Sequence, residues 1–589
     1  MSFILQSVVF PSYDLCGEES LYFKMNDRCA LQSLGRSKVL MQQGGRLFTN
    51  TYFNTVSIGK WKSYTGLTDL TLNLSFQGRV VLKWWWYRSE ERHLVIGESI
   101  LSCDDASYPV SVPVPQYERL TDGVVGFELF ALENSEIFDF DYRTTMQPRR
   151  QVRLGIVITH FNREQYVVPA VRRLNQQLLT DPSYADRVRL FVIDNSQNLT
   201  NAQMAGAKVI PNANLGGSGG FMRGLIHIQD SGEFTHGLFM DDDASNEIEA
   251  IRRTISLLEY AIDEKTAVSG AMLFEQYPAI QHENGAWFNG ICCPRNSGFD
   301  MSELGNIVEN EKLVQVDYGG WWFFAFPLKY VRHYTFPFFV RGDDIYFSLK
   351  NHFDIATLNG ICSWQEDFAI KDGPLTSYLD TRGHLVHNLL GTFSGSRRGK
   401  SLRMIRNWFR RYALTYHYES ANAVLDAVED VMEGPDFWLE NIDMRKRRSE
   451  ILSCVKNEKL QDVSTDWNLE FRQVKKSPKK QLSRRLTLNG HLLPKMFFKK
   501  YNVALPKGFG GRINESFRCN KILCVDSLSQ KGYVVEHDKR AFFSALRRYY
   551  KIRYRWWRNY DRLKVAYQAR ERELTSRDFW LKQFETHNK

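Results

Sequence analysis

The sequence predicts a chain of three parts, of which the middle one is an α/β domain on a parallel sheet. Alternating apolar and polar residues near the N-terminus predict an antiparallel β-sandwich, continuous apolar runs separated by helical segments predict the parallel sheet, and amphipathic spacing beyond about residue 390 predicts a mainly helical region. A chain of 589 residues is too long for one core. We expect the domains to be 1–150, 151–390 and 391–589.

The expected sandwich rests on short alternating segments between turns. Leu70, Leu72, Leu74 and Phe76 point to one face of a strand if the segment is extended. Two further apolar segments, "RVVLKWWWY" and "GVVGFELFAL", follow between turn-like sequences such as "DDASYP". Short strands of this kind are typical of a β-sandwich.

The central part reads as strand, helix, strand. "VRLGIVITHF" and "RVRLFVIDNS" suit strands buried on both faces, and "EQYVVPAVRRLNQQLL" between them has partly helical spacing. Ligands of such sheets bind outside the carboxyl ends of the strands. We therefore expect Asp194, Asn195 and Asp241–Asp243 to lie on one rim of the sheet.

The C-terminal part combines helical spacing with positive charge. "SANAVLDAVEDVMEG" is amphipathic, "DRLKVAYQARERELTSRDFWLKQF" predicts a charged terminal helix, and "KKSPKKQLSRRL" predicts an exposed loop or linker. The net charge of +10 is unevenly spread, because Ser396–Tyr412 and Leu546–Tyr560 are rich in Arg, Lys and aromatic residues. Such segments fit nucleic acid, an anionic membrane surface or an acidic sugar-phosphate ligand.

Three features of the whole chain bear on its location. "MSFILQSVVFPSYD" is a poor secretion signal, and no stretch of about 20 apolar residues predicts a membrane-spanning helix. The nine cysteines are scattered without a CxxC pair. They predict neither a zinc site nor a disulfide framework and favour a reducing cytoplasm.

The segment "NLGGSGGFMRG", Asn214–Gly224, is neither a P-loop nor a dinucleotide GxGxxG sequence. Its glycines fit a flexible loop or a close backbone approach to a ligand. A position between two strands, with Arg223 close behind, favours binding of an anion or a nucleotide.

Three carboxylates, Asp241–Asp243, follow the apolar run "HGLFM". Because residues two apart in an extended segment point to the same side, Asp241 and Asp243 are expected to converge while Asp242 faces away. Converging carboxylates are unfavourable unless a hard cation such as Mg²⁺ or Mn²⁺ lies there, with phosphates and water in its remaining positions. A solvated turn is the commoner explanation of an isolated acidic run, but the rim position favours a metal–nucleotide site.

Two further segments each allow a functional and a purely structural interpretation. Asp343 and Asp344 follow an apolar run, where one carboxylate could act as a general base or the pair could cap a helix. Trp321 and Trp322 follow a glycine turn in "GGWWFFAF". They fit core packing, or one of them could stack on a sugar in the cleft.

Taken together and in this order, "THFNRE", "VIDNS", "NLGGSGGF", "MDDDA", "GGWWFFAF" and "RGDDIYFSLK" resemble the galactofuranosyltransferases of glycosyltransferase family two. "NTYFNTVSIGKW" also resembles the β-sandwich of that family, and the resemblance covers about residues 45–390. It implies a Rossmann-like GT-A nucleotide-sugar domain that uses UDP-galactofuranose with inversion at the anomeric carbon.

The resemblance also implies roles for individual residues. Contacts to the nucleotide sugar are expected from Arg163, Asp194, Asn214, Gly216, Gly217, Arg223 and Asp242. Asp241 and Asp243 would hold Mn²⁺ or Mg²⁺, Asp344 would be the general base with Asp343 supporting the acceptor, and Trp321 and Trp322 would line the acceptor site.

One position departs from the family. The third metal ligand of the family is a histidine after a tryptophan, whereas Gln365 follows Trp364 here. A glutamine carbonyl can bind a hard cation weakly, and His384 or His387 is the alternative. We expect His384 to be the third ligand.

These observations predict a metal-dependent, inverting galactofuranosyltransferase of bacterial surface polysaccharide synthesis, building an O-antigen or a galactan. The expected partners are UDP-galactofuranose, a lipid-linked oligosaccharide acceptor and an anionic membrane surface, without nucleic acid, and a homo-oligomeric state stays open. The expected location is the cytoplasm, peripheral to the inner face of the cell membrane. Two alternatives remain, a family-two transferase for another nucleotide sugar such as rhamnose or galactopyranose, and a non-catalytic glycan- or nucleic-acid-binding protein.

Overall fold

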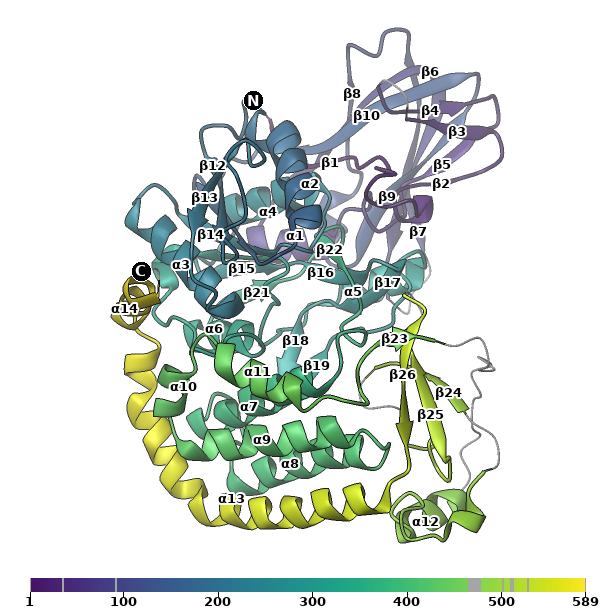
Figure 1. The fold of residues 1–589 in the computed structure, drawn as a ribbon. Coiled ribbons are helices and arrows are strands. Elements are labelled where there is room, and N and C mark those ends of the chain that lie inside the picture. Colours follow the sequence, from purple (N-terminus) through teal and green to yellow (C-terminus); the bar gives the residue numbers. More distant parts are fainter. Residues whose placement is uncertain are drawn as a thin grey trace.

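The computed structural model describes residues 2–33, 36–89, 93–463, 478–499, 503–508, 513–526 and 529–587. Figure 1 shows N-terminal strands beside a central α/β part, with the C-terminal helices below both. Within the described ranges no helix has the length and apolarity that a membrane crossing needs.

The N-terminal strands pair antiparallel around one long strand. β6 (Thr71–Tyr87) pairs with β8 and β10 through its first half and with β7 and β9 through its second half. Leu72, Leu74 and Phe76 on one face of β6 are fully buried, as their alternation predicts. The other strands are β1 (Phe3–Ser7), β2 (Lys24–Met25), β3 (Cys29–Gln32), β4 (Lys38–Met41), β5 (Arg46–Phe48), β7 (Leu94–Cys103), β8 (Val110–Pro113), β9 (Val124–Ala131) and β10 (Ser135–Thr144). Because β6 is shared, the ten strands form one connected sheet rather than two separate ones.

The central sheet has seven strands in the order β13-β12-β11-β14-β20-β15-β21. Their bounds are β11 (Leu154–His160), β12 (Val188–Asp194), β13 (Ala207–Pro211), β14 (His236–Asp241), β15 (Thr266–Ser269), β20 (Phe324–Pro327) and β21 (Asp354–Ala356). The first four are parallel, but β20 runs antiparallel to both its neighbours. The sheet is therefore mixed, and the parallel sheet expected from the sequence is corrected. A long excursion with its own strands precedes β20, in place of the helical crossover that parallel strands need.

The carboxyl ends of the parallel strands meet at one rim. Within the sheet, His160 of β11 is in register with Asp194 of β12, and Thr159 of β11 is in register with Asp241 of β14. The rim position predicted for these acids is thus confirmed. The helices of this part are α2 (Glu164–Leu174), α3 (Gly216–Asp230), α4 (Ile248–Tyr260), α5 (Leu304–Asn310) and α6 (Asp343–Asn351).

The excursion before β20 and the segment after β21 form two small sheets. One is β17-β16-β22, in which β16 (Ala271–Phe274) lies between β17 (Tyr277–Glu283) and β22 (Cys362–Gln365), and the other pairs β18 (Ala286–Phe288) with β19 (Cys292–Pro294). β22 runs parallel to β16 and ends at Gln365. These sheets carry residues from far along the chain to the acid-bearing rim.

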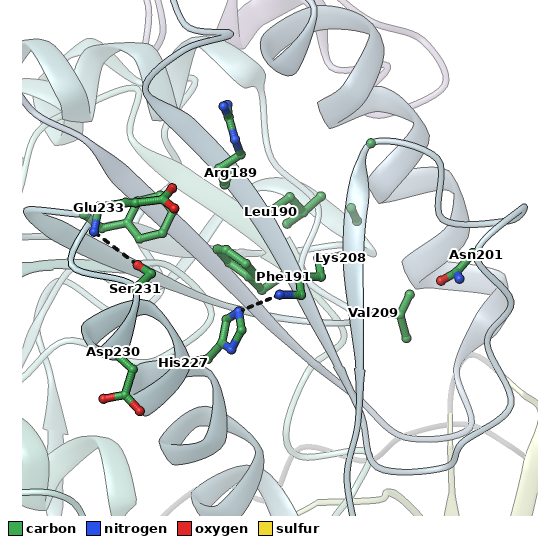
Figure 2. A pocket seen from close by; sticks show the side chains of 13 residues that line it. Arg189, Leu190, Phe191, Asn201, Lys208, Val209, His227, Asp230, Ser231 and Glu233 are labelled. Carbon is green, nitrogen blue, oxygen red and sulfur yellow. Dashed lines mark hydrogen bonds between the residues drawn. The ribbon is translucent and has the colours of Figure 1, made fainter.

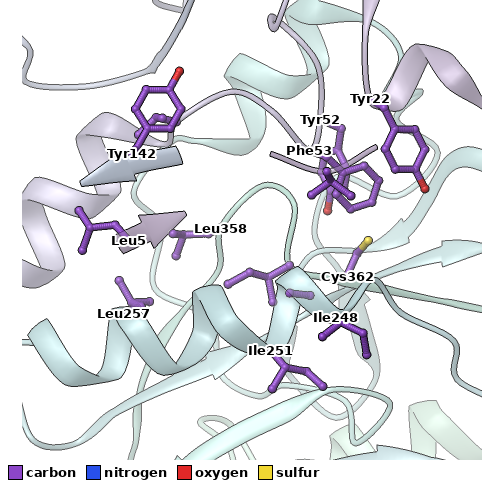
Figure 3. Close-up of a cluster of buried hydrophobic side chains, with 14 of the residues drawn as sticks. Leu5, Tyr22, Tyr52, Phe53, Tyr142, Ile248, Ile251, Leu257, Leu358 and Cys362 are labelled. Atoms are coloured by element: carbon purple, nitrogen blue, oxygen red, sulfur yellow. The ribbon is translucent and has the colours of Figure 1, made fainter. Parts of the chain in front are cut away.

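A continuous apolar core joins the N-terminal strands to the central part. Figure 3 shows Leu5, Tyr22 and Phe53 facing Ile248 and Ile251 of α4. The helix α1 (Ile58–Thr65) adds to this contact. The ring of Phe53 lies 5.8 Å from that of Trp364, the residue before Gln365. The segment after β5 thus packs against β22, the strand that ends at Gln365.

The C-terminal part is helical but also contains a sheet that the sequence did not predict. Its helices are α7 (Pro374–Leu390), α8 (Arg398–Ala413), α9 (Tyr418–Glu433), α10 (Asp436–Glu440), α11 (Arg445–Ser453), α12 (Pro478–Leu486), α13 (Lys539–Leu574) and α14 (Arg577–His587). Its strands pair in the order β23-β26-β25-β24, with β23 (Gln461–Asp462), β24 (Val503–Pro506), β25 (Lys521–Val525) and β26 (Lys531–Glu536).

Two C-terminal predictions need correction. Residues 478–486 of the expected linker form α12, while its residues 475–477 lie outside the described ranges. The expected terminal helix is two helices, because α13 ends at Leu574 and α14 begins at Arg577. α13 packs on α7, α8 and α9, so the last elements of the chain close the apolar core beside the central sheet.

Candidate functional site

Asp241 and Asp243, the first and last acids of the run Asp241–Asp243 (the triplet), converge on one side chain, as expected from the sequence. The amide nitrogen of Gln365 donates hydrogen bonds to Asp241 Oδ2 at 3.0 Å and to Asp243 Oδ1 at 2.9 Å. Asp242 Oδ2 instead accepts a hydrogen bond from the backbone N–H of Phe161 at 3.1 Å. The reason is not strand alternation, because β14 ends at Asp241 and the next two acids lie in a turn.

Two cations lie on the same acids. Arg163 Nη1 is 3.1 Å from Asp242 Oδ1 and 2.5 Å from Asp243 Oδ2, and Lys371 Nζ is 3.0 Å from Asp243 Oδ2. Burial alone would raise the pKa of Asp243, but Lys371 and Arg163 hold it below its usual range. Burial and the adjacent Asp243 raise the pKa of Asp241 to about 7. Arg and Lys in such a position are also the groups that bind phosphate oxygens.

The residues around the triplet fit a hard divalent cation. The Gln365 nitrogen marks a point within hydrogen-bond distance of both carboxylates, and the other end of the amide, Oε1, is buried without a partner. Mg²⁺ and Mn²⁺ accept carboxylate and amide oxygens. No group of three or more His, Cys, Asp or Glu within the described ranges could hold a metal ion. Gln365 is thus the polar side chain that contacts both Asp241 and Asp243.

His384 is not brought to the triplet. Its Nδ1 lies 2.6 Å from the backbone oxygen of Asp380 and its Nε2 lies 3.8 Å from Cys292 Sγ. In the described part of the chain it makes no hydrogen bond to Asp241 or Asp243. The alternative, His387, contacts the Gly342 oxygen and Thr392 instead. Both histidines belong to α7, and His387 contacts the residue before α6 rather than the triplet.

The glycine segment is a helix and not a loop. Gly216 begins α3 with a φ of +71°, and a side chain there would lie 2.0 Å from the backbone oxygen of Phe339. Gly220 and Gly224 face β11, where a methyl group would lie 2.2 Å from Thr159 and from Val157 respectively. Glycines four residues apart thus let α3 lie directly against β11. Close packing explains these glycines better than the flexible loop that the sequence allowed.

The second acidic pair begins α6, next to the start of α3. Ser218 Oγ donates a hydrogen bond to Asp343 Oδ2 at 2.9 Å, and the Ser218 N–H donates to the Phe339 oxygen at 3.0 Å. Gly217 lies against the same carboxylate. Burial raises the pKa of Asp343 to about 6, and burial with the adjacent Asp343 raises the pKa of Asp344 to about 7. The charge of Asp241 also raises the pKa of Asp344, so the two acidic clusters lie near each other.

Glu283 is a buried acid, within electrostatic reach of Asp344, that the sequence did not indicate. It ends β17, its side chain is buried, and its Oε1 has no hydrogen-bond partner in the described part of the chain. Burial, with a contribution from Asp344, raises its pKa to about 8. The segment "YPAIQHENG" does not show which face of β17 is buried, so only the packing identifies this acid.

Three residues expected to contact the nucleotide have local roles in the structure. The Asp194 carboxylate accepts hydrogen bonds from the backbone N–H groups of residues 196, 197 and 199, and Asn214 Oδ1 accepts one from Gly216. The Arg223 guanidinium lies 5.3 Å from the ring centre of Phe584 in α14. Asp194 and Asn214 shape loops at the rim, whereas Arg223 contacts the C-terminal helix and not the triplet.

Both tryptophans are buried, so the prediction that one of them stacks on a sugar is not supported. The ring of Trp321 is surrounded by those of Phe221, Phe239 and Phe347 at 4.9 to 5.8 Å. The Trp322 indole nitrogen donates to the Gly270 oxygen at 3.0 Å. Buried strand aromatics complete the core beneath the site.

A hollow of about 870 Å³ lies away from these acids. Figure 2 shows it between β12, β13 and α3, where Arg189, Lys208 and His227 line it. None of the predicted site residues lines this hollow. It is a feature of the sheet edge and not of the candidate site.

Curated relatives confirm the resemblance that the motifs predict. The chain is 23% identical over 420 residues to the galactofuranosyltransferase GlfT2 of Mycobacterium tuberculosis, covering 66% of this chain and 65% of that protein. It is 23% identical over 449 residues to the enzyme of the same name from Mycolicibacterium smegmatis, covering 69% and 67%. The chain thus matches about two thirds of the length of these relatives. No protein-family model matches it.

Solved structures give a weaker likeness. A mannosyltransferase from Pyrobaculum calidifontis, in complex with GDP-Man and Mn²⁺, aligns with a TM-score of 0.29 and 11% identity over 53% of this chain and 86% of that one. A glucosyl-3-phosphoglycerate synthase from Mycobacterium tuberculosis aligns with a TM-score of 0.27 and 12% identity over 39% and 77%. TM-scores this low do not establish a shared fold.

Proposed function

We propose that this chain is an inverting, metal-dependent glycosyltransferase that moves galactofuranose from UDP-galactofuranose to a glycan acceptor. The observation that carries the proposal is the closeness of two acidic clusters, one of which contacts two cations. Asp241 and Asp243 converge beside Arg163 and Lys371, and Asp344 lies within reach of the Asp241 charge. The likeness to galactofuranosyltransferases supports the choice of donor.

Asp241, Asp243 and Gln365 would hold Mn²⁺ or Mg²⁺. When bound, the ion would neutralise the diphosphate of the donor and so stabilise it as a leaving group. The side chains of Arg163 and Lys371 would bind the remaining phosphate oxygens. These groups would hold the diphosphate of the donor near Asp344.

Asp344 would accept the proton of the acceptor hydroxyl. As that oxygen bonds to the anomeric carbon, the bond from this carbon to the diphosphate oxygen breaks and its electron pair leaves with UDP. A pKa of about 7 keeps Asp344 partly ionised near neutral pH, which suits a general base. Asp343 holds the start of α6 to α3 through Ser218, and the buried carboxyl group of Glu283 lies within electrostatic reach of Asp344.

In this proposal the acceptor is lipid-linked, and the protein works at the inner face of the cell membrane in O-antigen or galactan synthesis. The decisive experiment compares turnover of UDP-galactofuranose with that of UDP-galactopyranose, with and without Mn²⁺, on a synthetic galactoside acceptor. Metal-dependent release of UDP from the furanose donor alone is the expected result. Preference for the pyranose donor, or for a nucleotide-rhamnose donor, would contradict the proposed donor sugar but support a glycosyltransferase. No turnover of any nucleotide sugar would favour a non-catalytic glycan-binding protein.

A further inference from the structure

The outer face of α13 exposes a row of aromatic side chains. Phe543, Tyr550, Tyr554 and Trp557 are 40%, 59%, 58% and 48% exposed. Their spacings of seven, four and three residues put them on one face of the helix. The opposite face is buried on α7, α8 and α9 through residues such as Trp556. Burial of the inner face therefore does not explain the outer aromatic row.

Cations flank this row on α13 and on its neighbour α8. The two helices are held by stacking of Phe409 on Tyr549, with ring centres 4.6 Å apart. Arg406 and Arg410 of α8 and Arg553 of α13 are exposed, and all three interact electrostatically with the Tyr549 hydroxyl. We call Arg406, Arg410, Tyr550, Arg553, Tyr554 and Trp557 the α8–α13 face.

The acids near this face are already paired. Asp561 forms an ion pair with Arg398, and Glu429 forms ion pairs with Arg548 and Arg555. The Tyr554 ring lies 6.4 Å from that of Trp557 and close to parallel with it. The face thus combines flat amphipathic rings with an excess of positive charge.

We propose that the α8–α13 face binds the surface of a lipid bilayer that carries anionic headgroups. Tyr and Trp rings are stable at the boundary between headgroups and acyl chains, and Arg side chains attract the anionic lipids around them. α13 lies on such a surface and does not cross it, since no described helix has the length and apolarity to span a bilayer. A second copy of the chain is disfavoured as occupant, because it would bring identical cations together.

The face is joined to the candidate site by a short series of contacts. Trp408 of α8 has its ring 5.5 Å from that of His384, and His384 Nε2 lies 3.8 Å from Cys292 Sγ. The charge of Asp344 acts on Cys292 in turn. α8 therefore carries cations of the face and also contacts, through Trp408, a residue of α7 near the candidate site. The bilayer proposal names the surface for the membrane location given in the proposed function and rests on that location, but not on the transfer reaction.

Vesicle flotation of the full chain tests the proposal. Wild-type protein is expected to float with vesicles containing phosphatidylglycerol, not with pure phosphatidylcholine vesicles, and less so as salt rises. Arg406→Glu with Arg410→Glu should weaken binding by roughly tenfold or more, because each lost cation removes attraction and each added acid is repelled. Tyr554→Ser with Trp557→Ser should weaken it at every salt concentration, because the rings no longer insert.

A matched control replaces exposed aromatic residues elsewhere. Tyr108→Ser with Tyr277→Ser removes two side chains that are 75% and 64% exposed on other surfaces, and it should bind vesicles like wild type. Turnover with a water-soluble acceptor separates the two proposals, because the face variants should keep it. Equal flotation of all four proteins would overturn the proposal, as would wild-type indifference to lipid charge. A change in oligomeric state or in RNA binding, with vesicle binding unaltered, would overturn it in favour of that partner.

Discussion

The end of β14 and the start of α6 both bury acids, but they surround them with different neighbours. At β14, Asp243 contacts Arg163 and Lys371, and its pKa lies below the usual range. At α6, burial and the adjacent Asp343 raise the pKa of Asp344 to about 7. The comparison teaches that one residue type is prepared for two tasks. Contact with two cations suits Asp243 to stay ionised, whereas burial beside another acid suits Asp344 to take up a proton near neutral pH.

Asp344→Asn tests the α6 half of the comparison and should have the largest effect. Removal of a general base is expected to lower kcat by about 100-fold to 10,000-fold. Affinities for UDP and Mn²⁺ should stay near those of wild type, because Asp344 does not contact the triplet. Kinetics and calorimetric titration measure both. Loss of UDP binding with retained turnover would reverse the two roles.

Asp243→Asn tests the β14 half. The variant should lose about tenfold to a hundredfold in Mn²⁺ affinity, since even changes outside the first coordination shell cost that much. Turnover should recover in part at high Mn²⁺. Isothermal titration with Mn²⁺ and UDP measures the loss, and Asp105→Asn on the N-terminal surface is a control. Unchanged affinity would show that the triplet holds no metal.

The pH dependence of kcat/KM tests the difference in pKa between Asp344 and Asp243. Asp344 must be ionised to act, so kcat/KM should rise about tenfold per pH unit below about pH 7 and level off above it. Asp243 stays ionised over that range and should contribute no step. The pKa of Asp241 is also raised to about 7, but a bound metal would keep this carboxylate ionised, so the profile is measured at saturating Mn²⁺. A profile measured at saturating Mn²⁺ that stays flat below pH 7 would refute the assignment of Asp344.

Substitution of Gln365 probes the group between the two carboxylates. Gln365→Ala should weaken Mn²⁺ binding by roughly tenfold, whereas Gln365→His should preserve or strengthen it, because an imidazole is a better ligand than an amide. Mn²⁺ titration followed by electron paramagnetic resonance gives this result without any turnover. Equal affinities for the three proteins would remove Gln365 from the ligand set.

Glu283→Gln should have the smallest effect, on stability. The pKa of Glu283 rises from its ordinary 4.5 to about 8 on folding, so the folded state binds more protons between these values. Its contribution to stability is therefore lost progressively as pH rises from about 4.5 to about 8. In the Gln variant the thermal midpoint should fall less steeply over this range. Parallel curves for wild type and variant would argue against a buried, neutral Glu283.

The position of Asp194 and Asp241 on one rim was predictable, because parallel strands end at the same edge of a sheet. The turn that follows β14 was not predictable, and it is this turn that places Asp243. Prediction from the sequence failed for the glycine segment. A glycine-rich pattern suits a flexible loop, but it also suits a helix that must approach β11 closely. The antiparallel β20 likewise followed from how a long excursion returns to the sheet.

The sequence by itself determined the direction of side chains within each strand, the clustering of Arg with aromatic residues, and the likeness to galactofuranosyltransferases. Only the tertiary structure decided that Gln365 and Lys371 meet the triplet, that Glu283 is buried beside Asp344, and that Trp321 lies in the core. Backbone geometry repeats over a few residues and fixes local direction, whereas the neighbours of a side chain come from distant segments whose positions depend on the packing of the whole core.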